Sequence, residues 1–193
     1  MRRSPRVVFT LPTAVWLSLW MYYDKTGGAA CSICAAVLHE LGHLSALWLL
    51  RDTPHSFRVG LFGAAIERNN AANLTYGQEM LSAAAGPAVN LLLAGILACL
   101  LPVSRRLLPA VQVNLSLALF NLLPLRVLDG GQILYAALCR RRLPEEARKI
   151  QKTIAAGVSV PLTAIGILLW KRGVGSYSLL LSSLFAVVSV VLP

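Results

Sequence analysis

Charged residues are scarce in this 193-residue chain, and acidic ones are the scarcest. Only 13% of the residues are charged, and eight Asp and Glu stand against 18 Lys and Arg. A soluble domain usually carries about a quarter charged residues. Hydrophobic residues make up 56% of the chain and recur in blocks; many of these reach the roughly 17–25 residues that a bilayer requires. The composition therefore excludes an ordinary soluble domain and predicts a polytopic membrane protein.

Several other features are missing as well. No basic stripe with interleaved aromatic residues stands apart from the apolar blocks, so the net charge of +10 does not indicate a nucleic-acid partner. The four cysteines lie in or beside apolar segments, and their spacing indicates no disulfide framework. No small-x-small cleavage site follows the apolar N-terminal stretch. We therefore expect an uncleaved first transmembrane helix.

Six apolar blocks follow one another along the chain. We predict an all-α polytopic membrane protein with about six transmembrane helices, folded as a single domain over 1–193. The blocks lie near 7–23, 29–50, 79–101, 107–138, 153–170 and 177–192. With the N-terminus inside, the inner connections hold more than twice as many Lys and Arg residues as the outer ones. Both termini are therefore expected in the cytosol.

Residues 56–67, "SFRVGLFGAAIE", form a short segment that cannot span a bilayer as a helix. Alternating apolar residues and the glycines at 60 and 63 are typical of a short re-entrant β-hairpin. Such backbone is tolerated at membrane depth only where protein or a watery cavity covers it. An ordinary amphipathic loop is an equally good interpretation of the same pattern.

The second block contains three ionisable residues in the motif HELGH at 39–43. On a helix, His39 and His43 lie about 40° apart in angle and about 6 Å apart along the axis, so both imidazoles can meet one metal ion. Glu40 is placed to reach a metal-bound water. Zinc suits such a site, because a catalytic zinc typically keeps three protein ligands and one open position. Ionisable side chains inside a membrane are costly and are functional candidates for that reason.

A third ligand has to come from elsewhere in the chain. Asp129 lies in the long fourth block, where Pro124 and the glycine pair that follows Asp129 are expected to break the helix and let the backbone bend toward a metal. His55 is the remaining histidine, but its polar surroundings predict a place at the membrane surface. Arg126 offers an alternative partner for Asp129 in a plain ion pair.

These residues resemble a known family. HELGH at 39–43, followed by NLLPLRVLDG at 121–130, is similar to the paired motifs of the site-2 protease family of intramembrane zinc metalloproteases. The resemblance implies one catalytic zinc ion with His39, His43 and Asp129 as ligands and Glu40 as general base. It covers about residues 29–138, a three-helix core. The blocks near 7–23, 153–170 and 177–192 are then additional helices.

The six-helix form is most similar to the branch that includes stage IV sporulation protein FB. The chain stops at Pro193 without that branch's C-terminal CBS domain, and it lacks the PDZ insertion of the envelope-stress branch. The resemblance implies regulated intramembrane proteolysis of a membrane-tethered protein, such as a sigma-factor precursor in sporulation. It also implies membrane regulatory proteins as partners. We expect a bacterial cytoplasmic or forespore membrane, with the active site toward the cytosol.

Two asparagines are candidates for supporting the substrate or the transition state. In the family, Asn121 is thought to hold the substrate backbone near the zinc. A buried amide can donate to a developing oxyanion, but it can equally satisfy carbonyls that Pro124 leaves free. Asn90 lies in "AAAGPAVNLLLAG" at 83–95, which resembles a third element of the family. For Asn90, Gly86 and Pro87, helix packing is the competing interpretation.

Two other classes of function fit parts of the pattern. A membrane transporter for metal ions or protons would explain the buried ionisable groups, but it gives Glu40 no necessary role. A catalytically silent binding protein of the same fold would explain the helices, although the motif set is intact. Both are alternatives to proteolysis.

Overall fold

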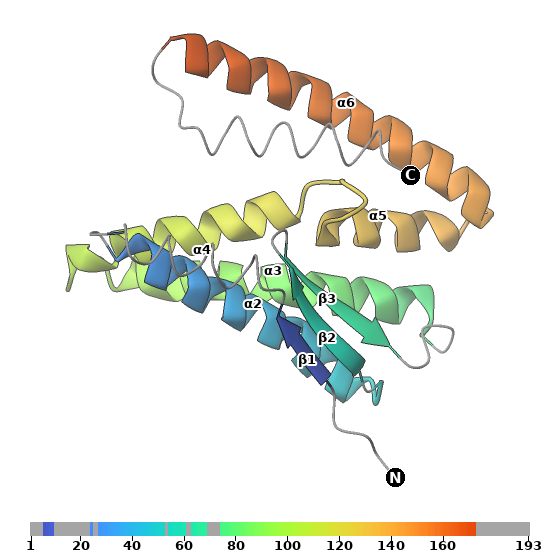
Figure 1. Cartoon of the computed structure of the whole chain (residues 1–193), viewed down its shortest axis with the longest axis horizontal. Coiled ribbons are helices and arrows are strands. Elements are labelled where there is room, and N and C mark those ends of the chain that lie inside the picture. Colours follow the sequence, from blue (N-terminus) through green and yellow to red (C-terminus); the bar gives the residue numbers. More distant parts are fainter. Residues whose placement is uncertain are drawn as a thin grey trace. The chain divides into compact units, whose positions relative to one another are not determined.

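The computed structural model describes residues 24, 27–52 and 74–172, together with the backbone of 6–9, 54–60 and 63–68. The chain divides into two compact units, Met1–Phe120 and Asn121–Pro193. The described part is mostly helical and also contains a small three-stranded sheet (Figure 1). The all-α prediction is corrected by this sheet.

The first unit is built around two packed helices, α2 (Gly28–Leu49) and α3 (Tyr76–Cys99). Helix α3 begins with a capping box, in which the Thr75 hydroxyl accepts from the backbone N–H of Gln78 and the Gln78 side chain accepts from that of Thr75. Gly42 lets the two backbones approach closely, because a Cβ at this position would lie 2.8 Å from the carbonyl oxygen of Ala85. These two helices correspond to the predicted blocks near 29–50 and 79–101.

The sheet comprises β1 (Arg6–Phe9), β2 (Pro54–Gly60) and β3 (Gly63–Arg68) in the order β1-β2-β3. Strand β2 pairs antiparallel with β3, so the segment interpreted as either a hairpin or a loop forms two paired strands. Strand β1 pairs parallel with β2. The prediction of a helix near 7–23 is therefore wrong at its start, and residues 10–23 lie outside the described residues. A short apolar run suits a strand as well as a helix, which is why periodicity alone did not separate them.

The long fourth block divides into α4 (Leu108–Asn121), preceded by the short 3-10 helix η2 (Arg105–Leu107), and α5 (Asp129–Cys139). The break lies at 122–128, around Pro124, as expected. Gly130 and Gly131 instead belong to the first turn of α5. A Cβ on Gly130 would lie 2.1 Å from the carbonyl oxygen of Leu122, and one on Gly131 would lie 1.9 Å from that of Leu125. These glycines let the segment before α5 fold back onto its first turn.

Helix α6 (Pro144–Lys171) packs on α5 within the second unit. Three described helices are long and apolar enough to cross a membrane, namely α2, α3 and α6. They match the predicted blocks near 29–50, 79–101 and 153–170. Helices α4 and α5 are shorter, with 14 and 11 residues. The block predicted near 177–192 lies outside the described residues.

We predict that Gly131→Ala destabilises the protein by about 1–3 kcal/mol, the usual cost of overpacking, because its Cβ would overlap the Leu125 carbonyl. Gly157→Ala in α6 is the matched control, since a Cβ there meets nothing within 4 Å. Replacing glycine by alanine in a helix interior stabilises by about 0.5–1 kcal/mol. Thermal unfolding in detergent should move the two variants in opposite directions. Equal melting temperatures would contradict the close packing at Gly131.

Candidate metal centre

His39 and His43 lie one helical turn apart on α2, with their imidazoles buried. Their Nε2 atoms are 3.2 Å apart, and the ring centroids are 4.8 Å apart with the planes at 79°. The helix places both side chains on one face, as the i, i+4 spacing predicts. Both rings thus turn the same nitrogen toward a common point.

The other nitrogen of each ring is bonded to α3. His43 Nδ1 lies 2.7 Å from the backbone carbonyl oxygen of Ser82, and His39 Nδ1 lies 2.6 Å from Oδ1 of Asn90. A carbonyl oxygen can only accept, so Nδ1 of His43 carries the hydrogen. The Nε2 atom of neutral His43 therefore presents a lone pair. Metal-binding histidines commonly have their second nitrogen held in this way.

Gly86 forms the surface of α3 beneath the two rings. A Cβ at this position would lie 2.3 Å from Nε2 of His43 and 2.8 Å from Nε2 of His39. No other amino acid leaves the two nitrogens where they are. Gly86 therefore has a packing role, and the groups that pack against it are the imidazoles of His39 and His43. Pro87 is fully buried inside the same helix.

Asp129 is the first residue of α5, directly after the N-cap residue Leu128. Its carboxylate is 9% exposed, and a helix N-terminus favours a negative charge at this position. Gln151 of α6 donates a hydrogen bond of 2.7 Å to the carbonyl oxygen of Gly131, which ties the first turn of α5 to α6. Arg126, the alternative partner considered for Asp129, has an exposed side chain.

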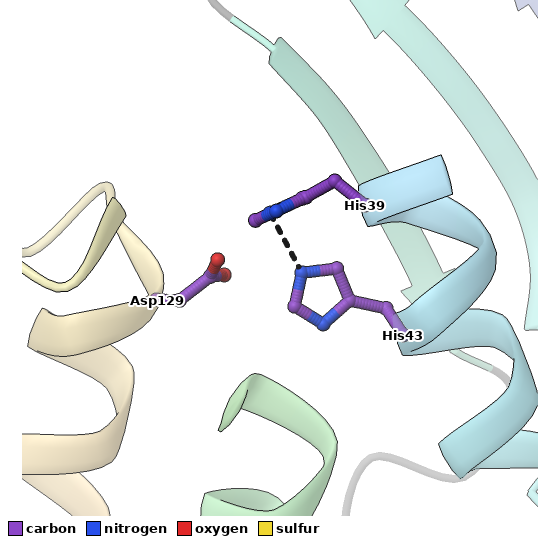
Figure 2. A group of neighbouring side chains, drawn as sticks. All are labelled: His39, His43 and Asp129. Carbon is purple, nitrogen blue, oxygen red and sulfur yellow. Dashed lines mark hydrogen bonds between the residues drawn. The ribbon is translucent and has the colours of Figure 1, made fainter. Parts of the chain in front are cut away.

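Figure 2 draws His39 and His43 of α2 and Asp129 of α5, whose imidazole nitrogens and carboxylate oxygens are atoms that can bind a metal ion. All three side chains are buried. Two imidazole nitrogens and one carboxylate oxygen are a donor set used by catalytic zinc sites.

The remaining predicted site residues have different surroundings. Glu40 is half-buried on α2, next to His39, and Asn121 is half-buried as the last residue of α4. Asn90 is fully buried, and its amide nitrogen donates to Ala35 O at 3.2 Å and to Asn114 Oδ1 at 2.8 Å. Both amide hydrogens are thus used within the protein, which favours the packing interpretation of Asn90 over donation to an oxyanion. His55 lies in β2, of which only the backbone is described.

Sequence reasoning missed Asn114 and Gln151, which the structure shows to be 5% and 4% exposed. Both are uncharged amides: Asn114 lies in the mostly apolar helix α4, whereas Gln151 lies in the charged first half of α6. A polar residue in an apolar span was the signal that identified the histidines, and the same signal was available at Asn114 but not at Gln151, which stands between charged residues. What the sequence lacked was any indication of their partners.

Comparisons with known proteins agree with this chemistry. The profile of Peptidase family M50 matches residues 103–162, a range that includes Asp129 but not the histidines. A protein named "Putative zinc metalloprotease Rip3", from two strains of Mycobacterium tuberculosis, is 35% identical over an alignment of 127 residues that covers 60% of this chain and 32% of the relative. The chain thus spans about a third of the length of the curated relatives it matches.

A solved structure shows the fold. The site-2 protease from Methanocaldococcus jannaschii aligns with a TM-score of 0.68 at 20% identity, covering 98% of this chain and 92% of that one. The chain therefore has a site-2 protease fold. At this identity the likeness establishes the architecture alone.

We predict that Gly86→Ala removes most of the bound metal, because its Cβ would displace the imidazole nitrogens. Gly95→Ala on the same helix is the control, since a Cβ there meets nothing within 4 Å. Metal content per folded protein, measured by atomic emission after purification with zinc, should fall only in the first variant. Full metal loading of Gly86→Ala would show that the histidines do not bind above this glycine.

Proposed function

We propose that this chain is an intramembrane zinc metalloprotease of Peptidase family M50. His39, His43 and Asp129 hold the metal, and Glu40 acts as general base. The observation that carries the proposal is a buried pair of histidine Nε2 atoms, 3.2 Å apart, in a helix apolar enough to span a membrane. We assign the third ligand to the buried carboxylate of Asp129. The profile match, the Rip3 relatives and the fold support the same family.

The residues fit a zinc ion. Tetrahedral ligands bound at about 2.0 Å lie about 3.3 Å apart, and the two Nε2 atoms lie 3.2 Å apart. Gly86 leaves open the space in front of them, which a side chain would fill. One carboxylate oxygen completes the three protein ligands of a catalytic site and leaves a fourth position for water. Zinc at this position supplies a water of lowered pKa and polarises the scissile carbonyl.

The protein's own residues handle the proton. Glu40 adjoins the ligand His39 on α2, where its carboxylate takes a proton from the attacking water as oxygen adds to the carbonyl carbon. The same carboxylate then delivers that proton to the amide nitrogen as the C–N bond breaks. Two products result, a carboxylate and an amine. We assign Asn121 a place beside the substrate backbone, where its amide N–H donates a hydrogen bond to the negative charge that develops on the carbonyl oxygen.

The substrate must expose a peptide bond before it can be cut. A transmembrane helix keeps its peptide groups bonded internally, so the segment to be cleaved has to unwind. We propose that the β2–β3 hairpin is re-entrant and that its edge pairs with the unwound segment by strand addition. The substrate is a membrane-tethered protein, for example a regulator such as a sigma-factor precursor. We also propose that the cleaved product is released on the cytosolic side of a bacterial membrane. The protease itself is proposed to be a bundle of about six transmembrane helices.

We predict that Glu40→Gln lowers the rate of cleavage by about 10²–10⁴-fold, the contribution of a general base, while zinc stays bound. The amide keeps the size of the side chain but cannot accept the proton from water. Glu79→Gln is the control, because Glu79 is a half-buried glutamate on the neighbouring helix α3. Cleavage of co-expressed single-span substrates and zinc content are measured together. A zinc-loaded Glu40→Gln enzyme of normal activity would sink the assignment.

We predict that Asp129→Asn weakens zinc binding by more than about 100-fold, which exceeds the usual cost of losing a partner that only orients a ligand. The amide has the same shape but lacks the negative charge. Glu145→Gln is the control, since it removes a carboxylate from the first turn of α6 without touching the site. Competition with a chelator measures the affinity. An Asp129→Asn variant that binds zinc normally would leave the metal with another third ligand.

A further inference from the structure

A buried chain of polar side chains connects α4 to α2 through α3. It runs from Asn114 on α4 to Asn90 on α3 and to His39 on α2, and these residues are 5%, 0% and 5% exposed. The Asn90 amide nitrogen lies 2.8 Å from Oδ1 of Asn114, and Oδ1 of Asn90 lies 2.6 Å from Nδ1 of His39. In an apolar interior every member of such a chain needs a partner. The direction of each bond therefore depends on the next one.

The direction is set at the α4 end by a backbone carbonyl. Asn114 Nδ2 lies 2.9 Å from the carbonyl oxygen of Ala110, which can only accept. The nitrogen of the Asn114 amide must therefore face Ala110, and its oxygen must face Asn90. A second carbonyl, Ala35 O, lies 3.2 Å from the same Asn90 nitrogen. Both neighbours of this nitrogen are acceptors, so the Asn90 amide turns its oxygen toward His39.

The chain ends by fixing a proton on the imidazole. A neutral imidazole has one donor and one acceptor nitrogen. Because Asn90 presents an oxygen, Nδ1 of His39 must carry the hydrogen and Nε2 must carry the lone pair. Turning the Asn90 amide over would place its oxygen against the oxygens of Ala35 and Asn114. The Ala35 carbonyl disfavours that arrangement, and the Asn114 oxygen, at the shorter distance, disfavours it further.

The two histidines differ in this respect. His43 is oriented directly by the Ser82 carbonyl, which cannot change direction. His39 is oriented by a side-chain amide, which can rotate unless something holds it. The Asn114 side chain and the backbone carbonyl of Ala35 hold it together, although Asn114 contacts neither imidazole in any hydrogen bond of the described residues.

We propose that Asn114 is a positioning residue of the metal centre. Acting through Asn90, it locks His39 in the tautomer whose Nε2 lone pair is available to a metal. The proposal rests on the proposed function only for the role of His39 as a ligand. The tautomer itself follows from the hydrogen bonds and can be measured without metal or substrate.

The direct test is nitrogen NMR of the metal-free protein, labelled with ¹⁵N-histidine and reconstituted in lipid at pH 8. The chain has three histidines, and the signals of His39 are identified by their loss in His39→Gln. We expect a protonated Nδ1 for His39 in the wild type. In Asn114→Leu, the His39 signals should shift toward a mixture of tautomers while those of His43 stay unchanged. A wild-type His39 that carries no hydrogen on Nδ1 would overturn the proposal.

Zinc affinity gives a second readout. We expect Asn114→Leu to bind zinc about 10–100-fold more weakly, the cost typical of losing a residue that orients a ligand. Asn114→Asp should stay closer to wild type, because its carboxyl group can still accept from Asn90. Ser116→Ala, at an exposed position of α4, is the control. Equal affinity in a folded Asn114→Leu protein would show that Asn114 serves packing alone.

The outcomes separate this inference from the proposed function. If the wild type has the expected tautomer but binds no zinc, the protease proposal fails and the positioning of His39 stands. If it binds zinc and cleaves substrates although His39 carries no hydrogen on Nδ1 in the metal-free state, the positioning role fails alone. Should Asn114→Leu not fold, the wild-type spectrum still decides the question.

Discussion

The described structure depends on two nitrogens that face each other at 3.2 Å inside an apolar helix pair. Two lone pairs at that distance repel unless a cation lies between them or one nitrogen is protonated. The rest of the first unit maintains this approach. Helix α3 bonds to the outer nitrogen of each ring, and Gly42 and Gly86 let it come close enough to do so. Hydrogen bonding and close packing between α2 and α3 therefore both hold the two Nε2 atoms in this position.

The second unit presents its carboxylate by different means. Asp129 is fixed by the start of a helix, which favours its charge and determines its direction. Gly130 and Gly131 let the preceding segment fold tightly over that start, and Gln151 joins it to α6. A histidine pair on a continuous helix and an aspartate at a helix terminus are thus two separate ways of holding a ligand.

Sequence reasoning succeeded where chemistry and local geometry coincide. The i, i+4 histidines had to share a face if α2 was helical, and Pro124 had to interrupt the fourth block. It failed at Arg6–Phe9, because four apolar or basic residues do not reveal whether their partner is a strand far along the chain. It also missed the partners of Asn90 and Asn114, since amide orientation depends on which helices are neighbours. Gly130 and Gly131 were expected to break the helix, whereas in the structure they form part of the first turn of α5.

The order of the residues along the chain bears on how the protein is made. Every described group that orients the two imidazoles, from Ala35 to Asn114, precedes residue 121, and Asp129 follows it in the second unit. During synthesis the nitrogen donors are accordingly assembled before the oxygen donor leaves the ribosome. A nascent chain that has inserted its first unit thus holds both imidazoles in their final orientation before Asp129 is available. If these three residues bind a metal as proposed, the second unit is needed to retain it.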